Sequence, residues 1–247
     1  MSHPTEATRS RADRRLTLRL ASGLVAVAAL GAGFLVLALL VRAKWDPLLD
    51  LDTTVAQRLH DVAVRHAWFV TLLKVLSDVF DPTVFRVVTT VVAVVLLVRR
   101  HHRLGIWVLV TVWGAALLGW GLKELVSRTR PDLVDAVATA PGNSFPSGHA
   151  LTSTVGSAVL LLLVMPLLRG RAARAAAVAV AVAIPLATGF ARVGLGVHYL
   201  SDVVAGELLG VALVATTAAV FRAWRRDVGL PEGPRTEAEP ELADERP

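Results

Sequence analysis

The chain has 247 residues, of which 54% are hydrophobic, together with a formal net charge of +6 and no cysteine. So large an apolar content, gathered in long uncharged runs, excludes an ordinary soluble domain and predicts that lipid surrounds most of the chain. The basic residues are divided among the segments between these runs, which argues against nucleic acid as a partner, and the lack of cysteine excludes disulfides, thiolate chemistry and cysteine-ligated zinc.

Six apolar runs come close to the length that a helix needs to cross a bilayer, about 20 residues. Two weaker runs hold one charge each, Arg86 in the second and Glu207 in the last. Backbone groups in lipid must be hydrogen-bonded within their own segment, so helices are expected. The sequence therefore predicts an all-α fold, a six-transmembrane-helix bundle within residues 16–226, with spans at about 20–41, 83–98, 104–122, 150–168, 175–191 and 203–221.

The remaining segments are polar. Residues 1–15 are basic and residues 227–247 are acidic and rich in proline, so both tails are predicted to be disordered. Between the first two spans, residues 43–82 mix apolar and charged positions at helix-like spacing, which predicts one or two interfacial helices on the membrane surface. Trp45 and Trp68 are expected to anchor them at the interface.

The arginines predict how the bundle is oriented. They cluster in the N-terminal tail and in three further segments, 99–103, 169–174 and 222–226, and all four clusters fall on one side of a six-span bundle. By the positive-inside rule this side is the cytoplasm, so both termini are predicted inside and residues 43–82 outside. The pattern is typical of a multi-pass protein of a bacterial inner, or plasma, membrane.

Polar residues interrupt the apolar pattern at three places, each at an end of a predicted span. By the derived topology all three places lie on the outer side, although the arginine clusters used only the other side. The sequence therefore predicts one polar site at the extracytoplasmic membrane surface. Its members are Lys123 and Arg130-Pro131, then Pro146, Ser147, Gly148 and His149, then Arg192, His198 and Asp202.

The charges in this set suit an anion with several oxygens. Lys123, Arg130 and Arg192 bring three positive charges toward one point. Ser147 is a candidate N-cap, and Gly148 leaves room for an oxygen to approach free backbone N–H groups at a helix start, where phosphate is favoured. These five residues are therefore candidates for binding a phosphoryl group.

The histidines supply the reactive groups. His149 and His198 are the acid, base or nucleophile candidates at neutral pH. If the stretch is helical, Asp202 shares a face with His198 and can accept its Nδ1–H, leaving Nε2 as a nucleophile. Phosphoryl transfer is therefore expected. The set lacks the carboxylates that a Mg²⁺ site would need, so no metal or other cofactor is predicted.

These motifs resemble the signature of the type-2 phosphatidic acid phosphatase superfamily of membrane lipid phosphatases. That signature is Lys-x6-Arg-Pro, then Pro-Ser-Gly-His, then Ser-Arg-x5-His-x3-Asp, and every internal spacing is kept in this chain. One position departs from it, because Ala191 stands where the family usually has serine, which removes a possible hydroxyl contact to phosphate. The resemblance covers roughly residues 105–221.

The resemblance implies a role for each matching residue. His198 would be the nucleophile, Asp202 would orient it, and His149 would be the general acid for the leaving group. The phosphoryl oxygens would be held by Lys123, Arg130, Ser147, Gly148 and Arg192. The implied function is metal-independent hydrolysis of a lipid phosphate or diphosphate in the bilayer through a phosphohistidine, the substrate being a polyprenyl diphosphate such as undecaprenyl diphosphate, phosphatidic acid or phosphatidylglycerol phosphate.

Other interpretations stay open. A lipid phosphotransferase would use the same nucleophile with an alcohol in place of water. A non-catalytic lipid-phosphate transporter would need the cations but not two histidines and an aspartate, and a vanadium haloperoxidase would not need six hydrophobic spans. Outside the motifs, Arg128 is predicted to be a loop charge, with contact to the substrate as the alternative. Glu207 is either a functional acid or a snorkelling or paired side chain. Four histidines are predicted at the surface or interface, His60, His66, His101 and His102.

Overall fold

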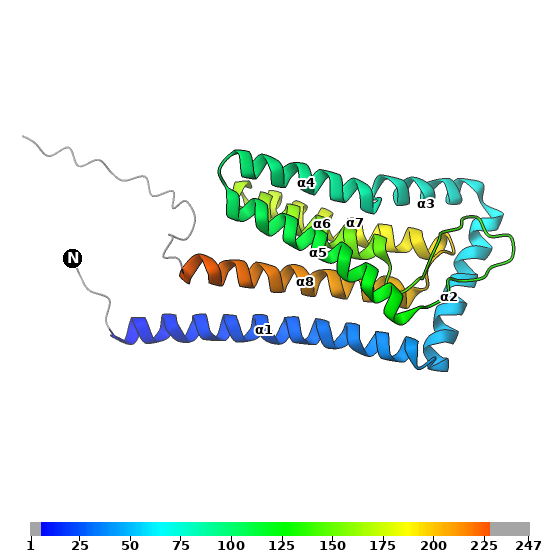
Figure 1. The fold of residues 1–247 in the computed structure, drawn as a ribbon, viewed down its shortest axis with the longest axis horizontal. Coiled ribbons are helices and arrows are strands. Elements are labelled where there is room, and N and C mark those ends of the chain that lie inside the picture. Colours follow the sequence, from blue (N-terminus) through cyan, green and yellow to red (C-terminus); the bar gives the residue numbers. More distant parts are fainter. Residues whose placement is uncertain (1–5, 228–247) are drawn as a thin grey trace, which may run out of the picture.

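The computed structural model describes the backbone of residues 6–227 and the side chains of residues 23–222. Over this range the chain contains helices and no strands, which confirms the all-α prediction (Figure 1). The α-helices are α1 Glu6–Arg42, α2 Asp46–Arg65, α3 Ala67–Val79, α4 Pro82–Val98, α5 His102–Val126, α6 Gly148–Val164, α7 Arg171–Gly194 and α8 Leu200–Asp227, and a short 3-10 helix, Met165–Leu167, follows α6.

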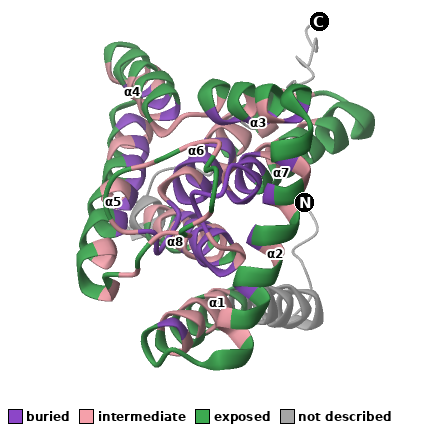
Figure 2. Cartoon of the chain, turned by 90° about the vertical axis from the view of Figure 1, so that its right-hand side faces the viewer, coloured by how far each residue is buried: buried purple, intermediate pink, exposed green. Residues whose placement is uncertain are grey.

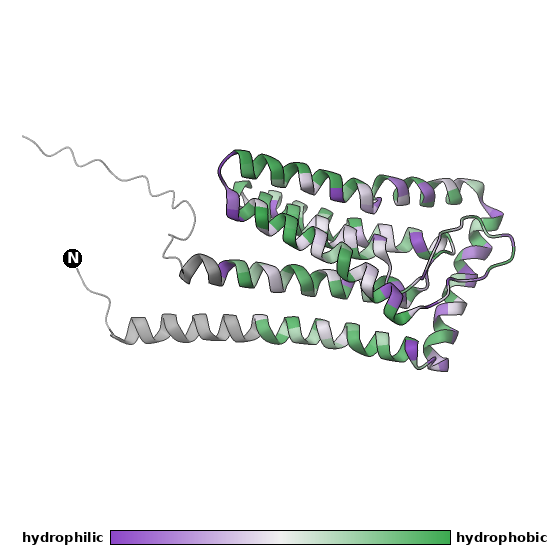
Figure 3. Cartoon of the chain, in the orientation of Figure 1, coloured by the Kyte–Doolittle hydropathy of each residue, from purple (hydrophilic) through white to green (hydrophobic). Residues whose placement is uncertain are grey.

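Six stretches of these helices are long and apolar enough to cross a membrane, as predicted. Figure 3 shows hydrophobic residues along the shafts of the helices and hydrophilic residues in the connections at both ends. Seen from one end of the bundle, buried residues concentrate on α6, α7 and α8, around which the other helices are arranged (Figure 2). The six stretches are Gly23–Arg42, Ala67–Val98, His102–Val126, Gly148–Leu167, Arg171–Gly194 and Leu200–Arg222.

The segment between the first two spans differs in part from the prediction. It forms two helices, and α2 crosses the end of the bundle, as expected of an interfacial helix (Figure 1). However, α3 runs on in line with α4, so that Ala67–Val98 is one candidate span instead of residues 83–98 alone. Because its two charged residues, Lys74 and Asp78, lie one turn apart on one side of an otherwise apolar helix, α3 is apolar enough to lengthen the second predicted span.

The first helix begins inside the N-terminal segment for which disorder is predicted. Because α1 starts at Glu6, residues 6–15 are helical here, and residues 1–5 lie outside the described part. Several of these residues, among them glutamate, alanine and arginine, have high helix propensity and lead directly into the apolar run. The predicted acidic tail lies outside the described residues beyond position 227.

Glycines in α8 allow it to pack closely against α6. A Cβ atom on Gly206 would lie 2.7 Å from the carbonyl oxygen of Ser147, and one on Gly210 would lie 2.9 Å from the side chain of Thr154. Small residues at such positions allow the backbones of membrane helices to approach. As a result, the Ser147 N–H donates to the backbone oxygen of Asp202 at 2.9 Å, which joins the starts of the two helices that carry the candidate site.

Cysteine labelling tests the predicted orientation. Thr139 and His101 are exposed, and they lie in connections at opposite ends of the bundle (Figure 1). Since the chain has no cysteine of its own, single cysteines at these two positions should react with a membrane-impermeant maleimide from opposite sides of intact cells or vesicles. Position 139 is expected to label from outside. Labelling of both positions from the same side would refute the six-span topology.

Candidate active site

The connection from α5 to α6, residues 127–147, folds back over the end of α5 and carries Arg130 inward. The ammonium group of Lys123 donates to the carbonyl oxygen of Asn143 at 2.6 Å, and the Asn143 amide donates in return to the carbonyl oxygen of Lys123 at 3.0 Å. Arg130 also donates to the Asn143 carbonyl, at 3.3 Å, and further to the carbonyls of Pro141 and Gly142. Two of the predicted phosphate-binding cations therefore meet at one carbonyl oxygen.

The start of α6 has the form that its sequence predicts. Ser147 is buried, and its side-chain oxygen accepts from the N–H of Ala150 at 3.4 Å, which confirms it as the N-cap. A Cβ atom on Gly148 would lie 3.9 Å from the Cε atom of Lys123. Lys123 thus lies beside the positive end of the α6 dipole, and both favour an anion at this point.

His198 and Asp202 form the predicted pair, but not on a common helix. Because α8 begins at Leu200, His198 lies in the turn before it. Asp202 reaches back as the third residue of α8: one of its oxygens accepts from the N–H of Tyr199 at 2.9 Å and lies 3.4 Å from Nδ1 of His198. This resembles one half of a capping box, in which an acidic side chain satisfies the N–H before a helix. The helix cap, and not a shared helix face, brings carboxylate and imidazole together.

The other nitrogen of His198 faces a cation. Nη1 of Arg130 lies 3.2 Å from Nε2 of His198 and donates to the carbonyl oxygen of Val197 at 2.7 Å. Because the carboxylate of Asp202 accepts from Nδ1, Nε2 is left with its lone pair, which the Arg130 N–H can meet. Burial lowers the pKa of His198 to about 4, although Asp202 acts in the opposite direction. The imidazole is therefore neutral at pH 7, the form that a nucleophile needs.

The junction of α3 and α4 supplies two partners that the sequence did not reveal. The Asp81 carboxylate lies 3.4 Å from Nε2 of His149, and its other oxygen caps α4 by accepting from the N–H of Thr83. Arg192 donates to the Ser77 hydroxyl at 2.9 Å. No pattern in the sequence marked Ser77 or Asp81, because their position depends on α3 and α4 forming one span beside α6 and α7.

All eight predicted site residues therefore come together at one end of the bundle. Lys123, Arg130 and Arg192 lie close enough to repel one another electrostatically, and His149 lies within the electrostatic reach of Arg192 and His198. The Nε atom of Arg192 is buried and has no hydrogen-bond partner among the described residues. A buried cationic donor without a partner is costly, and it fits a site that binds an anion.

Comparison with known proteins assigns this arrangement to a family. A family model described as the PAP2 superfamily matches residues 104–226, about half of the chain, and this match contains all eight residues. Residues 104–226 form a PAP2 superfamily domain. This stretch contains the three motifs that resemble the signature of type-2 phosphatidic acid phosphatases.

Curated relatives match the PAP2 domain over part of their length. Undecaprenyl-diphosphatase of Sulfolobus acidocaldarius is 34% identical over 125 residues, which cover 49% of this chain and 56% of the relative. Decaprenylphosphoryl-5-phosphoribose phosphatase of Mycobacterium tuberculosis is 40% identical over 102 residues, or 40% of this chain and 49% of the relative. Phosphatidylglycerophosphatase B of Bacillus subtilis is 34% identical over 98 residues, covering 39% and 48%. The chain thus spans about half the length of these relatives.

A solved structure extends the likeness beyond the PAP2 domain. The crystal structure of a transmembrane PAP2-type phosphatidylglycerolphosphate phosphatase from Bacillus subtilis superposes with a TM-score of 0.71 at 23% identity. The match covers 81% of this chain and 98% of the other. At this identity it shows the fold, which includes helices that precede the PAP2 domain. The chain is accordingly a multi-pass, all-helical membrane protein.

Arg128 lies in the connection after α5, as predicted, two residues before Arg130, but it is buried. Its side chain is only 8% exposed, and its two terminal nitrogens lie 2.7 Å from carboxylate oxygens of Asp52 and Asp202 respectively. The sequence did not predict this burial, which arises because α2 and α8 enclose Arg128 between two acids. The only hint in the sequence was its closeness to the motif arginine.

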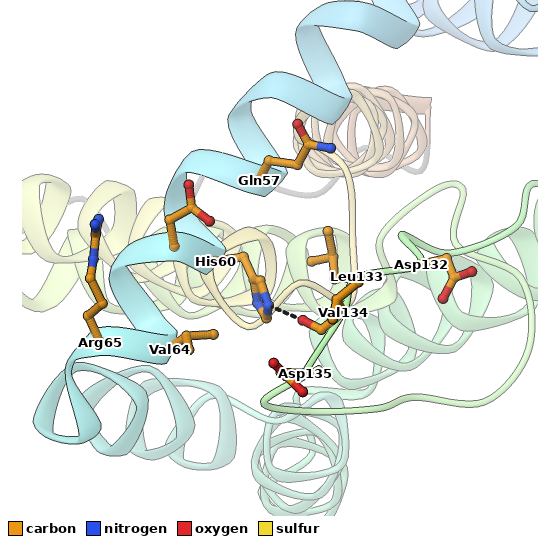
Figure 4. A pocket seen from close by; sticks show the side chains of 9 residues that line it. Gln57, His60, Val64, Arg65, Asp132, Leu133, Val134 and Asp135 are labelled. Atoms are coloured by element: carbon orange, nitrogen blue, oxygen red, sulfur yellow. Dashed lines mark hydrogen bonds between the residues drawn. The ribbon is translucent and has the colours of Figure 1, made fainter.

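His60 is likewise not a surface residue. It is buried on α2, and its Nε2 lies 2.6 Å from the carbonyl oxygen of Val134, so it fastens α2 to the connection that follows Arg130. The surface prediction failed because it could not foresee that residues 132–135 fold over α2. A pocket of about 530 Å³ lies alongside this contact (Figure 4), lined by Gln57, His60, Asp61, Val64, Arg65, Asp132, Leu133, Val134 and Asp135, and none of the eight predicted site residues borders it.

Two further positions of the PAP2 domain were left open by the sequence. Ala191 is fully buried in an apolar cluster with Phe69 and Leu73, so its methyl group packs against α3. Glu207 has one buried carboxylate oxygen with no hydrogen-bond partner among the described residues, and that oxygen would be 3.2 Å from a Cβ atom on Gly189. The paired-side-chain alternative for Glu207 therefore gains no support from the contacts around this oxygen.

Proposed function

We propose that the chain is an integral-membrane phosphatase that hydrolyses a lipid phosphate or diphosphate through a phosphohistidine on His198. One observation carries the proposal: a buried neutral imidazole has Asp202 behind Nδ1 and Arg130 beside Nε2, within a cluster of cations at the end of an apolar bundle. A carrier would need the cations alone. The names of the curated relatives, each a phosphatase or diphosphatase, support the same class of reaction.

In the first step, Nε2 of His198 attacks phosphorus. A bond forms between Nε2 and phosphorus while the bond from phosphorus to the leaving oxygen breaks, and protonated His149 gives its proton to that oxygen. The Asp81 carboxylate lies 3.4 Å from Nε2 of His149, where it can accept a hydrogen bond from the protonated ring. Lys123, Arg130 and Arg192 stabilise the negative charge on the phosphoryl oxygens throughout.

In the second step, water replaces the leaving group. Neutral His149 takes a proton from the water as its oxygen attacks phosphorus, the bond to Nε2 breaks, and inorganic phosphate leaves. Asp202 holds the Nδ1–H tautomer in both steps and stabilises the positive charge that Nε2 substitution places on the ring. An alcohol in place of water would give the phosphotransferase alternative.

The substrate is proposed to carry a lipid tail because the site lies where apolar helices end. Substrate and active site would then face the outer leaflet. Phosphate release from a panel of phosphatidic acid, phosphatidylglycerol phosphate and polyprenyl diphosphates, with His198→Ala as the negative control, tests the class and ranks its members. Product analysis with added alcohols separates hydrolysis from transfer: a phosphorylated alcohol formed at the expense of free phosphate would favour the transferase.

Chelation and vanadate test the metal-independent chemistry. The candidate site is built from cations and histidines, and the described residues contain no group of three or more His, Cys, Asp or Glu that could hold a metal. Hydrolysis should therefore keep its rate in EDTA, whereas vanadate, which can mimic five-coordinate phosphorus, should inhibit it. Both are measured as phosphate release in detergent micelles. Loss of activity in EDTA that Mg²⁺ restores would overturn the proposed mechanism.

A further inference from the structure

Asp52 lies outside the PAP2 domain, yet it reaches the residues behind the candidate nucleophile. It is on α2, fully buried, and accepts from the backbone N–H of Ser201 at 2.9 Å and from the Ser201 hydroxyl. Ser201 is the second residue of α8, so its N–H is one of those left without a partner inside the helix. A carboxylate from another helix therefore caps α8 immediately before Asp202.

Arg128 connects Asp52 to Asp202. Nη2 donates to Asp52 at 2.7 Å, and Nη1 donates both to Asp202 at 2.7 Å and to the Ser201 hydroxyl at 2.8 Å. The guanidinium carbon lies 4.1 Å from the centre of the Tyr199 ring, which fixes the plane of the group from one face. A continuous series of contacts thus leads from Asp52 through Arg128 and Asp202 to His198.

Such a buried series is not explained by stability alone. Removing charges from water costs free energy that mutual attraction often does no more than offset, so apolar residues of the same size would serve a purely structural purpose as well. The series has a geometric result, however. Because Arg128 holds one oxygen of Asp202, the other oxygen stays directed at Nδ1 of His198 and at the N–H of Tyr199.

We infer that Asp52 and Arg128 are positioning residues of the active site, which hold Asp202 in place and moderate the negative charge that it presents to His198. The inference rests on the proposed function, since it assigns the network to the nucleophile. It makes the crossing helix α2 part of the catalytic apparatus, although α2 contributes nothing to the PAP2 motifs.

Because of the charges around His198, removal of Arg128 and removal of Asp52 should affect the pKa of His198 differently. Asp202 faces His198 from α8, Arg130 from the connection before α6, Arg192 from α7, and His149 from α6, while Arg128 and Asp52 act on it through Asp202. Loss of Arg128 exposes His198 to the uncompensated charge of Asp202 and raises the pKa of the imidazole. Loss of the charge of Asp52 leaves Arg128 paired with Asp202 alone, so the charge of Asp202 stays compensated and the pKa of His198 does not rise.

The test compares Arg128→Met, Arg128→Lys and Asp52→Asn in the full-length protein in detergent. Arg58→Met and Asp50→Asn, at exposed positions of the same helix α2, are the matched controls. We expect kcat to fall about 10–100-fold in the three network variants, as when a group behind a functional ligand is removed, with KM changed much less. In Arg128→Met alone, the acidic limb of the plot of kcat/KM against pH should shift to higher pH by on the order of one unit. Arg128→Lys should show no such shift because lysine keeps the positive charge.

A double variant tests whether the two residues act as one unit. Arg128→Met combined with Asp52→Asn should lose no more kcat than Arg128→Met alone, because residues in one network are not additive. If Arg128→Met does not fold, Arg128→Lys and Asp52→Asn still test the inference. Both should show a reduced kcat and an acidic limb of the pH profile at the wild-type position. Network variants that match their controls in kcat and pH profile would overturn the positioning role alone, whereas a wild-type protein that releases no phosphate from any lipid would overturn the proposed function.

Discussion

Replacing His198 by alanine should abolish the covalent intermediate and lower phosphate release by several orders of magnitude. The variant loses the imidazole that lies between Asp202 and Arg130, which is the proposed nucleophile. Deletion of a catalytic nucleophile has effects of this size. Rapid quench with ³²P-labelled substrate should trap a protein-bound label in the wild type that is labile in acid and stable in base, as a phosphoramidate is. The label should be absent from His198→Ala.

The matched control for this variant is His101→Ala, at an exposed histidine in the turn before α5 at the other end of the bundle. It should keep the wild-type label and turnover. Turnover at the wild-type rate in His198→Ala would assign the chemistry to another residue. A wild type that binds the lipid but releases no phosphate would favour the carrier.

Replacing His149 by alanine should slow hydrolysis by about 10²–10⁴-fold, the usual size of a general acid–base contribution. The loss should depend on the leaving group. An alkoxide leaves a phosphate monoester badly without a proton, whereas a phosphate group leaves a diphosphate with less need of one. The ratio of kcat/KM for phosphatidic acid to that for a polyprenyl diphosphate should therefore fall in His149→Ala.

Asp81→Asn provides the companion measurement. It removes the carboxylate that lies 3.4 Å from His149, so it should change the same ratio in the same direction by a smaller factor. An equal loss on both substrates in His149→Ala would mean that this histidine binds the phosphoryl group and does not protonate the leaving oxygen. The assignment of the general acid would then have to move to another group.

The eight motif residues could be found from the sequence because each lies at the end of an apolar span, and the ends of spans on one side must meet. Charge placement then indicates which ends those are. The sequence also predicts the pairing of His198 with Asp202, but from a shared helix face that the structure does not have. The same four-residue spacing fits a side chain in the first turn of a helix that reaches back to the residues before it.

The partners of these residues could not be found in this way. Asp52, Ser77 and Asp81 come from a region whose mixed polarity predicts a membrane surface. Only the packing of α2, α3 and α4 against α6, α7 and α8 brings them to the site. Burial of Arg128 depends on the same packing. The local sequence pattern around a charged residue is the same whether that residue is solvated or buried in an ion pair. It therefore does not distinguish a surface charge from a buried one.

The contact between Asp52 and Ser201 joins residues 149 positions apart, and this separation has a consequence for biosynthesis. Asp52 belongs to one of the first segments to be made, whereas Ser201 and Asp202 belong to the last helix. A nascent chain that has inserted only α1 to α7 already holds every motif cation, but His198 and Asp202, which follow α7, are still missing. The contacts that link Asp52 to Asp202 form only when α8 docks beside α2. If the proposed function holds, full turnover then begins with the last step of assembly, and a copy with a misplaced α2 would stay in the membrane with reduced activity.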